Sequence, residues 1–270
     1  MSCKAIPRSR SWRAGICLHR RMGNLPDPSH LENLVVVLVR PRNPLNIGAA
    51  VRAMSNFGAH KLRLVNPYAV AFREARSAVG ALQLLRDAQE YKTVAEAVAD
   101  CVLVVGTTAV RNRILHQPLL RLDEGSEKIR AQLLSGRVAL LFGSEKIGLT
   151  NEDLTHCQRL LHIPTQADHI SMNLAQSVAV CLYELARKDG SQARETEIDR
   201  ATAGANEQIT ESLLEALHTS GYVKPGNDAM CEEKVRRLVL RFNLSAFDAK
   251  VLLGMVRQIV WKLRQEKASG

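Results

Sequence analysis

The 270-residue sequence lacks several patterns that identify common classes of protein. It has no run of 18 apolar residues, which excludes a membrane-spanning helix. The longest apolar stretch near the start, at 16–18, is too short for the core of a secretory signal. None of the six cysteines forms a Cys-x-x-Cys pair, and several lie in apolar stretches, which argues against a structural zinc site and for a reducing compartment. We therefore expect a cytoplasmic protein with no membrane partner and no bound metal.

The two common glycine-rich phosphate loops are also missing. No Gly-x-Gly-x-x-Gly occurs, so a classical dinucleotide-binding site has no support. Gly143 and Gly148 have the glycine spacing of a P-loop, but Leu149 stands where the essential lysine should be.

The sequence does carry a surplus of positive charge. Lys and Arg number 37 against 27 Asp and Glu, a net charge of +10 that suits a polyanion such as nucleic acid. Half of this surplus lies in residues 1–30, while residues 31–186 have a net charge of only +3. We expect 1–30 to be a disordered basic tail that the chemistry does not need. An organellar transit peptide, or a true start at Met22, are the alternatives for its first 21 residues.

Residues 31–188 alternate between β-branched runs and helical stretches, which predicts an α/β domain with a mostly parallel sheet. The run at 34–39 is apolar throughout, as expected for a strand buried on both faces. The predicted strands are 34–39, 62–65, 102–105, 138–142 and 160–163. The predicted helices are 46–57, 78–91, 94–99, 126–134 and 171–188.

Residues 189–205 are polar, small and charge-balanced, which indicates a linker. Beyond it, 206–270 reads as a small helical extension, and Ser245 suits the N-cap of its last helix, with Asp248 in the first turn. So short a unit has a marginal core, so we expect it to pack against something else. Its three predicted helices are 207–219, 230–242 and 245–265.

Three polar or glycine-bearing segments follow predicted strands, where open α/β sheets usually bind ligands. The first runs from 40 to 52, where Asn46 could cap the next helix and Arg52 could hold a phosphate with both ends of its guanidinium. The second places Glu145 between Gly143 and Gly148, glycines that allow close approach of a flat ligand. Each segment alone is equally compatible with an ordinary turn.

The third segment follows 163 and leads into a predicted helix. Ser171 could serve only as an N-cap, and His169 fits a solvated loop. Asn173 is a poor helix former in the first turn unless its amide has a function there. The order and spacing of the three segments are more informative than any one of them.

Taken together, the segments resemble the knotted SPOUT-class RNA 2′-O-ribose methyltransferases, specifically the TrmH/TrmJ group. Three blocks carry the resemblance: Asn46-Ile-Gly-Ala-Ala-Val-Arg52, Phe142-Gly-Ser-Glu-Lys-Ile-Gly-Leu149, and Ile163-Pro with Ser171-Met-Asn-Leu-Ala175. The match covers roughly residues 33–188. The helical extension after a polar linker is similar to the TrmJ branch, which acts on nucleotide 32 of the tRNA anticodon loop.

The resemblance implies a deep trefoil knot in the C-terminal part of the α/β domain, a homodimer, an RNA partner (tRNA or rRNA) and S-adenosylmethionine as cofactor. In the family picture Arg52 organises the target phosphate and ribose hydroxyl, and the remaining catalytic candidates, Asn46, Glu145, Ser171 and Asn173, position them. The residues implied to bind the cofactor are Thr107, Thr108, Ala109, Gly143, Ile163, Ile170, Ser171 and Met172.

A ribose hydroxyl becomes a good nucleophile only when its proton is withdrawn. A guanidinium normally stays charged, so a phosphate oxygen held by Arg52 is an alternative proton acceptor to Arg52 itself. Two other functions remain open from sequence: a related enzyme acting on rRNA or another tRNA position, and an RNA-binding protein that has lost methyl transfer.

Overall fold

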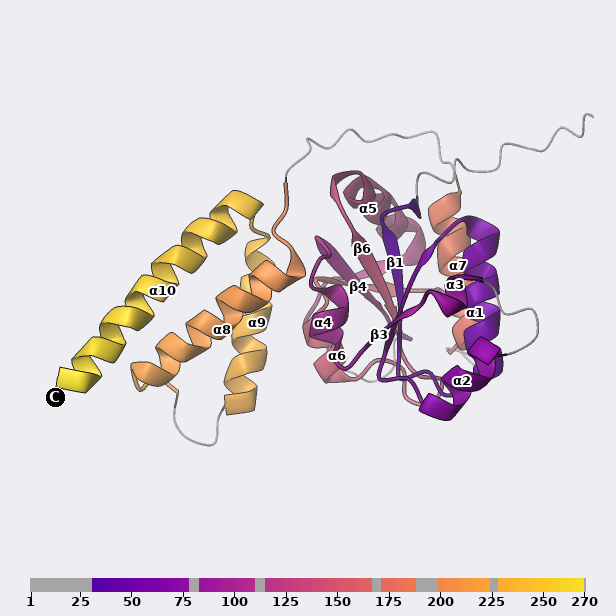
Figure 1. Ribbon diagram of the computed structural model, residues 1–270. Helices are drawn as coiled ribbons and strands as arrows, with labels where there is room; N and C mark the ends of the chain where they lie inside the picture. The colour runs from indigo at the N-terminus through magenta and orange to yellow at the C-terminus, as the bar shows by residue number, and fades with distance from the viewer. Residues whose placement is uncertain are drawn as a thin grey trace, which may run out of the picture.

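Parallel strands form one sheet at the centre of the computed structural model, which describes residues 31–77, 83–109, 115–166, 171–187, 199–223 and 228–269 (Figure 1). Along the sheet the strands follow the order β3-β2-β1-β6-β4-β7-β5, and every neighbouring pair is parallel. The strands are β1 (Leu34–Val39), β2 (Lys61–Val65), β3 (Gln89–Tyr91), β4 (Leu103–Thr107), β5 (Leu119–Arg121), β6 (Val138–Phe142) and β7 (Arg159–His162).

Helices cover both faces of this sheet, which confirms the predicted α/β class (Figure 1). Strand β1 shows why its whole run is apolar: alternate residues enter two different cores, Val36 on the face of α1 and α7 and Val37 on the face of α4. The helices of this domain are α1 (Pro44–Phe57), α2 (Ala69–Ser77), α3 (Gln83–Arg86), α4 (Val94–Val98), α5 (Leu122–Ser135), α6 (Asn151–Thr155) and α7 (Leu174–Ala186).

The helix predicted over 78–91 is wrong. Its described part holds only the short helix α3, and residues 89–91 form the edge strand β3 instead. Edge strand β5 was likewise not predicted. Both strands are three residues long and carry exposed positions, so neither shows the apolar pattern of a buried strand.

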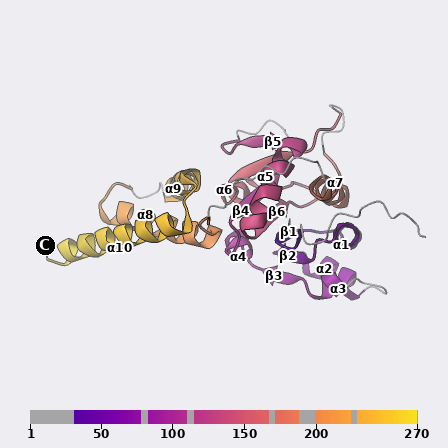
Figure 2. The ribbon, with the colours of Figure 1, turned by 90° about the horizontal axis from the view of Figure 1, so that it is seen from above.

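The C-terminal unit consists of α8 (Ala203–Thr219), α9 (Asp228–Phe242) and α10 (Ala246–Ser269), and it stands beside α4 and α6 (Figures 1 and 2). Its core is small, as expected. Helix α8 begins three residues before 206, and its first backbone amides bond the sheet domain: Ala203 N–H donates to Cys101 O and Gly204 N–H to Ala99 O, at 2.7 and 2.8 Å. A side chain at Gly204 would meet Ala99 O at 2.8 Å, so this close approach needs glycine.

The cap of α10 and the burial of two cysteines agree with the sequence analysis. Ser245 Oγ accepts from Asp248 N–H at 3.0 Å, as an N-cap does. Cys101 and Cys181 are buried, and burial raises the pKa of both thiols to about 12. Cys181 packs in the apolar core as a small hydrophobic residue. No helix in the described ranges is long and apolar enough to cross a membrane. The connection from β7 to α7 includes residues 167–170, outside the described ranges, so the knot stays a prediction.

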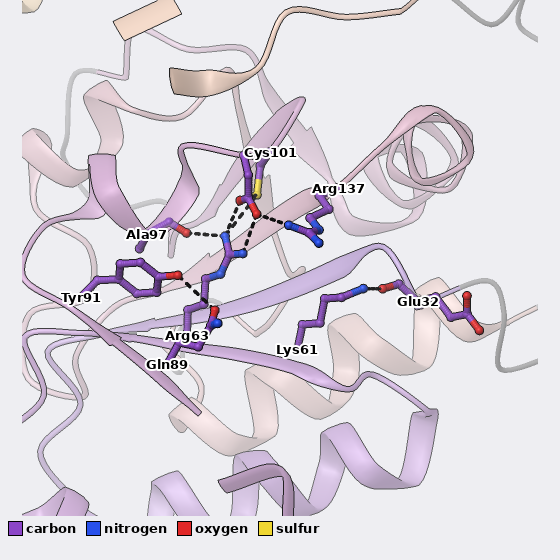
Figure 3. Close-up of polar contacts among 9 residues, drawn as sticks. Glu32, Lys61, Arg63, Gln89, Tyr91, Ala97, Cys101 and Arg137 are labelled. Carbon is purple, nitrogen blue, oxygen red and sulfur yellow. Dashed lines mark hydrogen bonds and ion pairs between the residues drawn. The ribbon is translucent and has the colours of Figure 1, made fainter. Parts of the chain in front are cut away.

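An ion pair with one buried partner, Arg63, ties β2 to α4 and to the start of β6 (Figure 3). The guanidinium of Arg63, 6% exposed, donates to both carboxylate oxygens of Asp100, at 2.5 and 2.8 Å, and to Ala97 O at 2.8 Å. Arg137 binds the same carboxylate, and the Arg63 guanidinium also lies over the ring of Tyr91. Hydrogen bonds from Arg63 hold the pKa of Asp100 well below its usual range.

We expect Asp100→Asn to lower the free energy of unfolding by about 2 kcal/mol, because it leaves the buried Arg63 guanidinium without its counter-charge. The effect is smaller than for a fully buried pair because Asp100 is partly exposed. A carboxylate with a lowered pKa stabilises the fold above its unfolded pKa and loses that contribution as pH falls. The difference between variant and wild type should therefore shrink below about pH 4.

Urea denaturation at pH 7 and at pH 3 to 4 measures this. Asp123→Asn is the matched control, because its ion pair with Arg121 has both side chains more than half exposed and should contribute about 0.5 kcal/mol or less. Equal losses in the two variants would show that the Asp100 cluster has no special role in stability.

Candidate active site

The three segments singled out in the sequence follow β1, β6 and β7, and they meet at the carboxyl edge of the sheet. The loop after β6 is a tight one, in which Gly148 N–H donates to Ser144 O at 2.8 Å and Gly148 has a left-handed φ of +70°. This loop raises Glu145 toward the loop that follows β1. The carboxyl ends of neighbouring parallel strands share one edge of the sheet, which is why segments about 100 residues apart come together.

Glu145 holds the first loop through three hydrogen bonds, all 3.1 Å long. Its carboxylate accepts from the backbone N–H groups of Arg42 and Asn43 and from the side-chain amide of Asn46. Partial burial opposes ionisation of Glu145, but these bonds and one from its own backbone outweigh burial and lower its pKa. Glu145 is therefore an ionised acceptor whose oxygens are already engaged, which makes it a poor general base.

Asn46 links this pair to the third segment. Its side-chain oxygen accepts from the amide of Asn173 at 2.9 Å, and Asn173 in turn caps α7, accepting from Ala175 N–H at 2.9 Å. The side-chain amide of Asn173 thus has two functions, capping α7 and donating to Asn46, which explains a poor helix former at this position. The chain Glu145–Asn46–Asn173 joins all three segments into one polar surface.

Two helix starts differ from the sequence reading. Asn43, not Asn46, caps α1, with its side-chain oxygen accepting from Leu45 N–H at 2.9 Å, because Pro44 opens that helix. Ser171 is not the cap of α7, which begins at Leu174 after the Asn173 cap. Neither Asn46 nor Ser171 therefore caps a helix.

Arg52 lies apart from this polar surface. Its side chain is exposed on α1 and makes no hydrogen bond or ion pair with any described residue. Six residues along a helix correspond to about 9 Å and a turn of about 240°, so Arg52 and Asn46 do not share a helix face. One copy of the chain does not bring Arg52 to Glu145.

A cavity of about 390 Å³, here named the Gly143 cavity, opens beside the Glu145 loop. All described residues predicted to bind the cofactor line it, while Ile170 lies outside the described ranges. The sequence analysis did not assign part of its floor to the cofactor site, namely three buried apolar side chains, of which two end the motif block around Glu145. The predicted residues that line it are Thr107, Thr108, Ala109, Gly143, Ile163, Ser171 and Met172, and the missed floor is Phe142, Leu149 and Leu161.

The Gly143 cavity fits a molecule that is partly flat and partly polar. Its volume is within the usual range for small-molecule sites, and its floor is apolar. Thr165, on its wall, has a buried hydroxyl with no hydrogen-bond partner among the described residues, which a ligand's polar atom would satisfy. An open groove of about 510 Å³ adjoins it and is lined by Asn46 and Arg42; Glu145 and Lys146 line both spaces.

Arg40 and Asp153 support the first loop, a role that sequence reasoning did not assign. Arg40 directly follows β1 and has a left-handed φ of +51°, and its guanidinium binds both carboxylate oxygens of the buried Asp153. Hydrogen bonding to Asp153 raises the pKa of Arg40 further. Asp153 also closes a capping box with Thr150 at the start of α6. The strained turn after β1 is therefore pinned to the segment that follows the Glu145 loop.

Comparison with known proteins places this site in a family. The model described as SpoU rRNA Methylase family matches residues 33–183, more than half of the chain and all three site segments. The chain belongs to the SpoU methylase family. Among the described residues of this SpoU methylase, no group of three or more His, Cys, Asp or Glu side chains is arranged to hold a metal ion.

Relatives extend the similarity beyond the SpoU domain. The proteins named tRNA (cytidine/uridine-2′-O-)-methyltransferase TrmJ from Photorhabdus laumondii and from Escherichia coli K12 are each 32% identical, over 85% and 88% of this chain and 97% and 99% of their own. The crystal structure of TrmJ from Z. mobilis ZM4 superposes with a TM-score of 0.73 at 31% identity, over 83% of this chain and 98% of that one. The likeness therefore includes C-terminal helices as well as the sheet domain.

Proposed function

We propose that this SpoU methylase transfers a methyl group from S-adenosylmethionine to a ribose 2′-hydroxyl of tRNA, at nucleotide 32 of the anticodon loop. The observation that carries the proposal is the bonded chain Glu145–Asn46–Asn173 beside the Gly143 cavity. Similarity to the TrmJ proteins over nearly their whole length supports the tRNA substrate.

S-adenosylmethionine supplies an electrophilic methyl group when bound. The apolar floor of the Gly143 cavity suits its adenine, and the free Thr165 hydroxyl and the backbone around Gly143 offer polar partners. These residues exclude water from the bound cofactor and fix its orientation. A methyl group held in this way lies in line with the attacking ribose hydroxyl, which raises the rate of transfer. The cofactor role of each lining residue remains a prediction.

The polar residues position the RNA and do not supply the base. Glu145 has its oxygens engaged and a lowered pKa, so it orients Asn46, which lines the adjoining groove together with Arg42. In this proposal Arg52 binds the phosphate next to the target ribose, and an oxygen of that phosphate accepts the hydroxyl proton.

We propose that the protein acts as a homodimer. Arg52 does not line the Gly143 cavity of the copy that carries it, so a second copy would have to supply the arginine. Two exposed apolar side chains, Leu45 on α1 and Tyr183 on α7, lie on helices that pack side by side and offer a surface for a second copy. Light scattering should give twice the chain mass of 29.9 kDa.

The proposed function is tested by methyl transfer to total tRNA followed by mapping of the modified nucleotide. A 2′-O-methyl group at position 32 supports it, and modification elsewhere in tRNA, or in rRNA supplied in parallel, would assign the enzyme to the alternative substrates. Calorimetry with S-adenosylmethionine distinguishes the non-catalytic alternative: an RNA-binding protein without transfer should show no binding.

Deletion of residues 1–30 should leave methyl transfer within about twofold of wild type, because the three site segments begin after residue 39. Those residues carry half of the net charge, so the measurement also tests whether bulk charge contributes to RNA affinity. Both kcat and the KM for tRNA should be measured at 0.1 M salt. A KM raised more than tenfold would show that the tail holds the substrate.

A further inference from the structure

A second concave site lies at the junction of the sheet domain and the C-terminal unit. This junction cleft has a volume of about 600 Å³ and lies at the amino ends of β4, β5 and β7, opposite the Gly143 cavity. Its described lining includes no Asp or Glu but six Lys or Arg side chains. These are Lys128, Arg159, Arg200, Lys234, Arg237 and Arg241.

Helix α9 contributes half of these cations from one face. Lys234, Arg237 and Arg241 are three and seven residues apart, which places them along one side of the helix. Arg236 points elsewhere: it is neutralised by Glu207 and Glu232, both at 2.7 Å. Glu207 and Glu232 are thus engaged away from the cleft, and of the three cleft cations of α9 only Arg237 has an acidic neighbour within the described ranges, Glu233. Helix α9 packs beside α6 at this junction (Figure 2).

The cations of the junction cleft have few partners of their own. The side chains of Lys128, Arg159, Lys234 and Arg241 form no hydrogen bond or ion pair with any described residue, and the guanidinium of Arg200 donates only to the carbonyl of Asn243, at 2.8 Å. The sixth cation, Arg237, has one acidic neighbour: Oε1 of Glu233 lies 3.4 Å from its Nη1. That nitrogen is buried and makes no hydrogen bond within the described ranges.

An array of like charges around one hollow is unfavourable until an anion enters it. A buried guanidinium N–H without an acceptor adds to that cost, and a phosphate oxygen satisfies it best because its geometry matches the guanidinium fork. No Phe, Tyr or Trp lines the described cleft, and its one aromatic ring among the described residues is that of His116, so it offers little surface for base stacking. These features select a phosphate backbone and not a nucleobase.

We propose that the junction cleft binds the phosphate backbone of the RNA substrate at a distance from the methylated nucleotide; this rests on the proposed function. Leu103 at the start of β4 lines the cleft, and Thr107 at its end lines the Gly143 cavity. Four residues of strand span about 13 Å, so a single nucleotide cannot reach both. The cleft contacts a different part of a folded RNA and contributes affinity without reading its sequence.

The test compares two double variants that each remove two exposed charges from the C-terminal unit. Lys234→Gln/Arg241→Gln removes charges from the cleft, and Lys250→Gln/Arg257→Gln removes the same number from α10 outside it. Fluorescence anisotropy with labelled total tRNA is measured from 0.05 to 0.3 M salt, without cofactor. We expect the cleft variant to bind about tenfold or more weakly at 0.1 M salt and to lower the slope of log K against log salt by about 1.5. The α10 variant should stay within about twofold of wild type.

Equal effects of the two variants, or an unchanged salt slope in the cleft variant, would overturn the proposal. Inorganic tripolyphosphate is the second probe. If the cleft variant no longer binds tripolyphosphate but binds tRNA with wild-type affinity, the cleft is a site for a small phosphate ligand and the proposal is wrong. Because binding is read without methyl transfer, failure here is distinguishable from failure of the proposed function, which shows as no transfer by the wild type. Lys128→Gln/Arg159→Gln, on the sheet-domain wall, should reproduce the weaker binding.

Discussion

Arg52→Ala should lower methyl transfer by about 100- to 1,000-fold while leaving S-adenosylmethionine binding at the wild-type level. The reason is geometric and electrostatic. Arg52 does not line the Gly143 cavity, so its loss removes nothing from the cofactor site. Without its guanidinium, nothing holds the substrate phosphate in position to accept the hydroxyl proton.

The measurement needs two separate assays, single-turnover methyl transfer with saturating tRNA and calorimetry with the cofactor. Arg52→Lys keeps the charge but loses the planar fork, so it should recover only part of the rate. Arg257→Ala, which removes an exposed arginine from α10, is the matched control and should transfer normally. Transfer by Arg52→Ala at the wild-type rate would remove Arg52 from the mechanism.

Gly143→Ala should abolish measurable cofactor binding, weakening it by about 100-fold or more. A Cβ at this position would lie 1.9 Å from the carbonyl carbon of Gly148 and 2.0 Å from Leu149 N, both backbone atoms. Backbone cannot rotate aside as a side chain can, so the whole loop that carries Glu145 must shift by more than 1 Å. That loop forms one wall of the Gly143 cavity, so the shift displaces the contacts that hold the cofactor.

Calorimetry and thermal unfolding together separate the local effect from general loss of structure. A variant that unfolds cooperatively near the wild-type temperature but does not bind S-adenosylmethionine shows that the loop geometry is what matters. Gly254→Ala is the control, because a Cβ there meets nothing within 4 Å and alanine favours the helix that contains it. Normal cofactor affinity in Gly143→Ala would place the cofactor outside this cavity.

Local patterns predicted the central elements well and the edges poorly. Strand β1 was visible because both of its faces are buried, so every residue is apolar. Strand β3, residues 89–91, was read as part of a helix because it lies at the sheet edge with two exposed residues, and its pairing with β2 depends on a partner far away in the sequence. Short edge strands carry no periodicity of their own.

For the candidate site, too, the sequence identified residues but not the contacts between them. Asn46, Glu145, Ser171 and Asn173 were identified from motif spacing, yet the hydrogen bonds that join Asn46 to residues 99 and 127 positions away appear only in the folded chain. The support given by Arg40 to the first loop was also invisible, because its partner lies 113 residues further on.

The sequence by itself determined the main alternation of strands and helices, the three segments of the candidate site and the family, because these follow from local periodicity and fixed spacing. The tertiary structure alone decided which of those residues touch, and it assembled the junction cleft. The C-terminal unit looked nearly neutral in sequence, since acidic and basic residues almost balance there. In the folded chain Glu207 and Glu232 pair with Arg236, while Lys128 of α5, Arg159 of β7, and Lys234 and Arg241 of α9, whose side chains have no partner among the described residues, line one cleft. Charge acts through space and not along the chain.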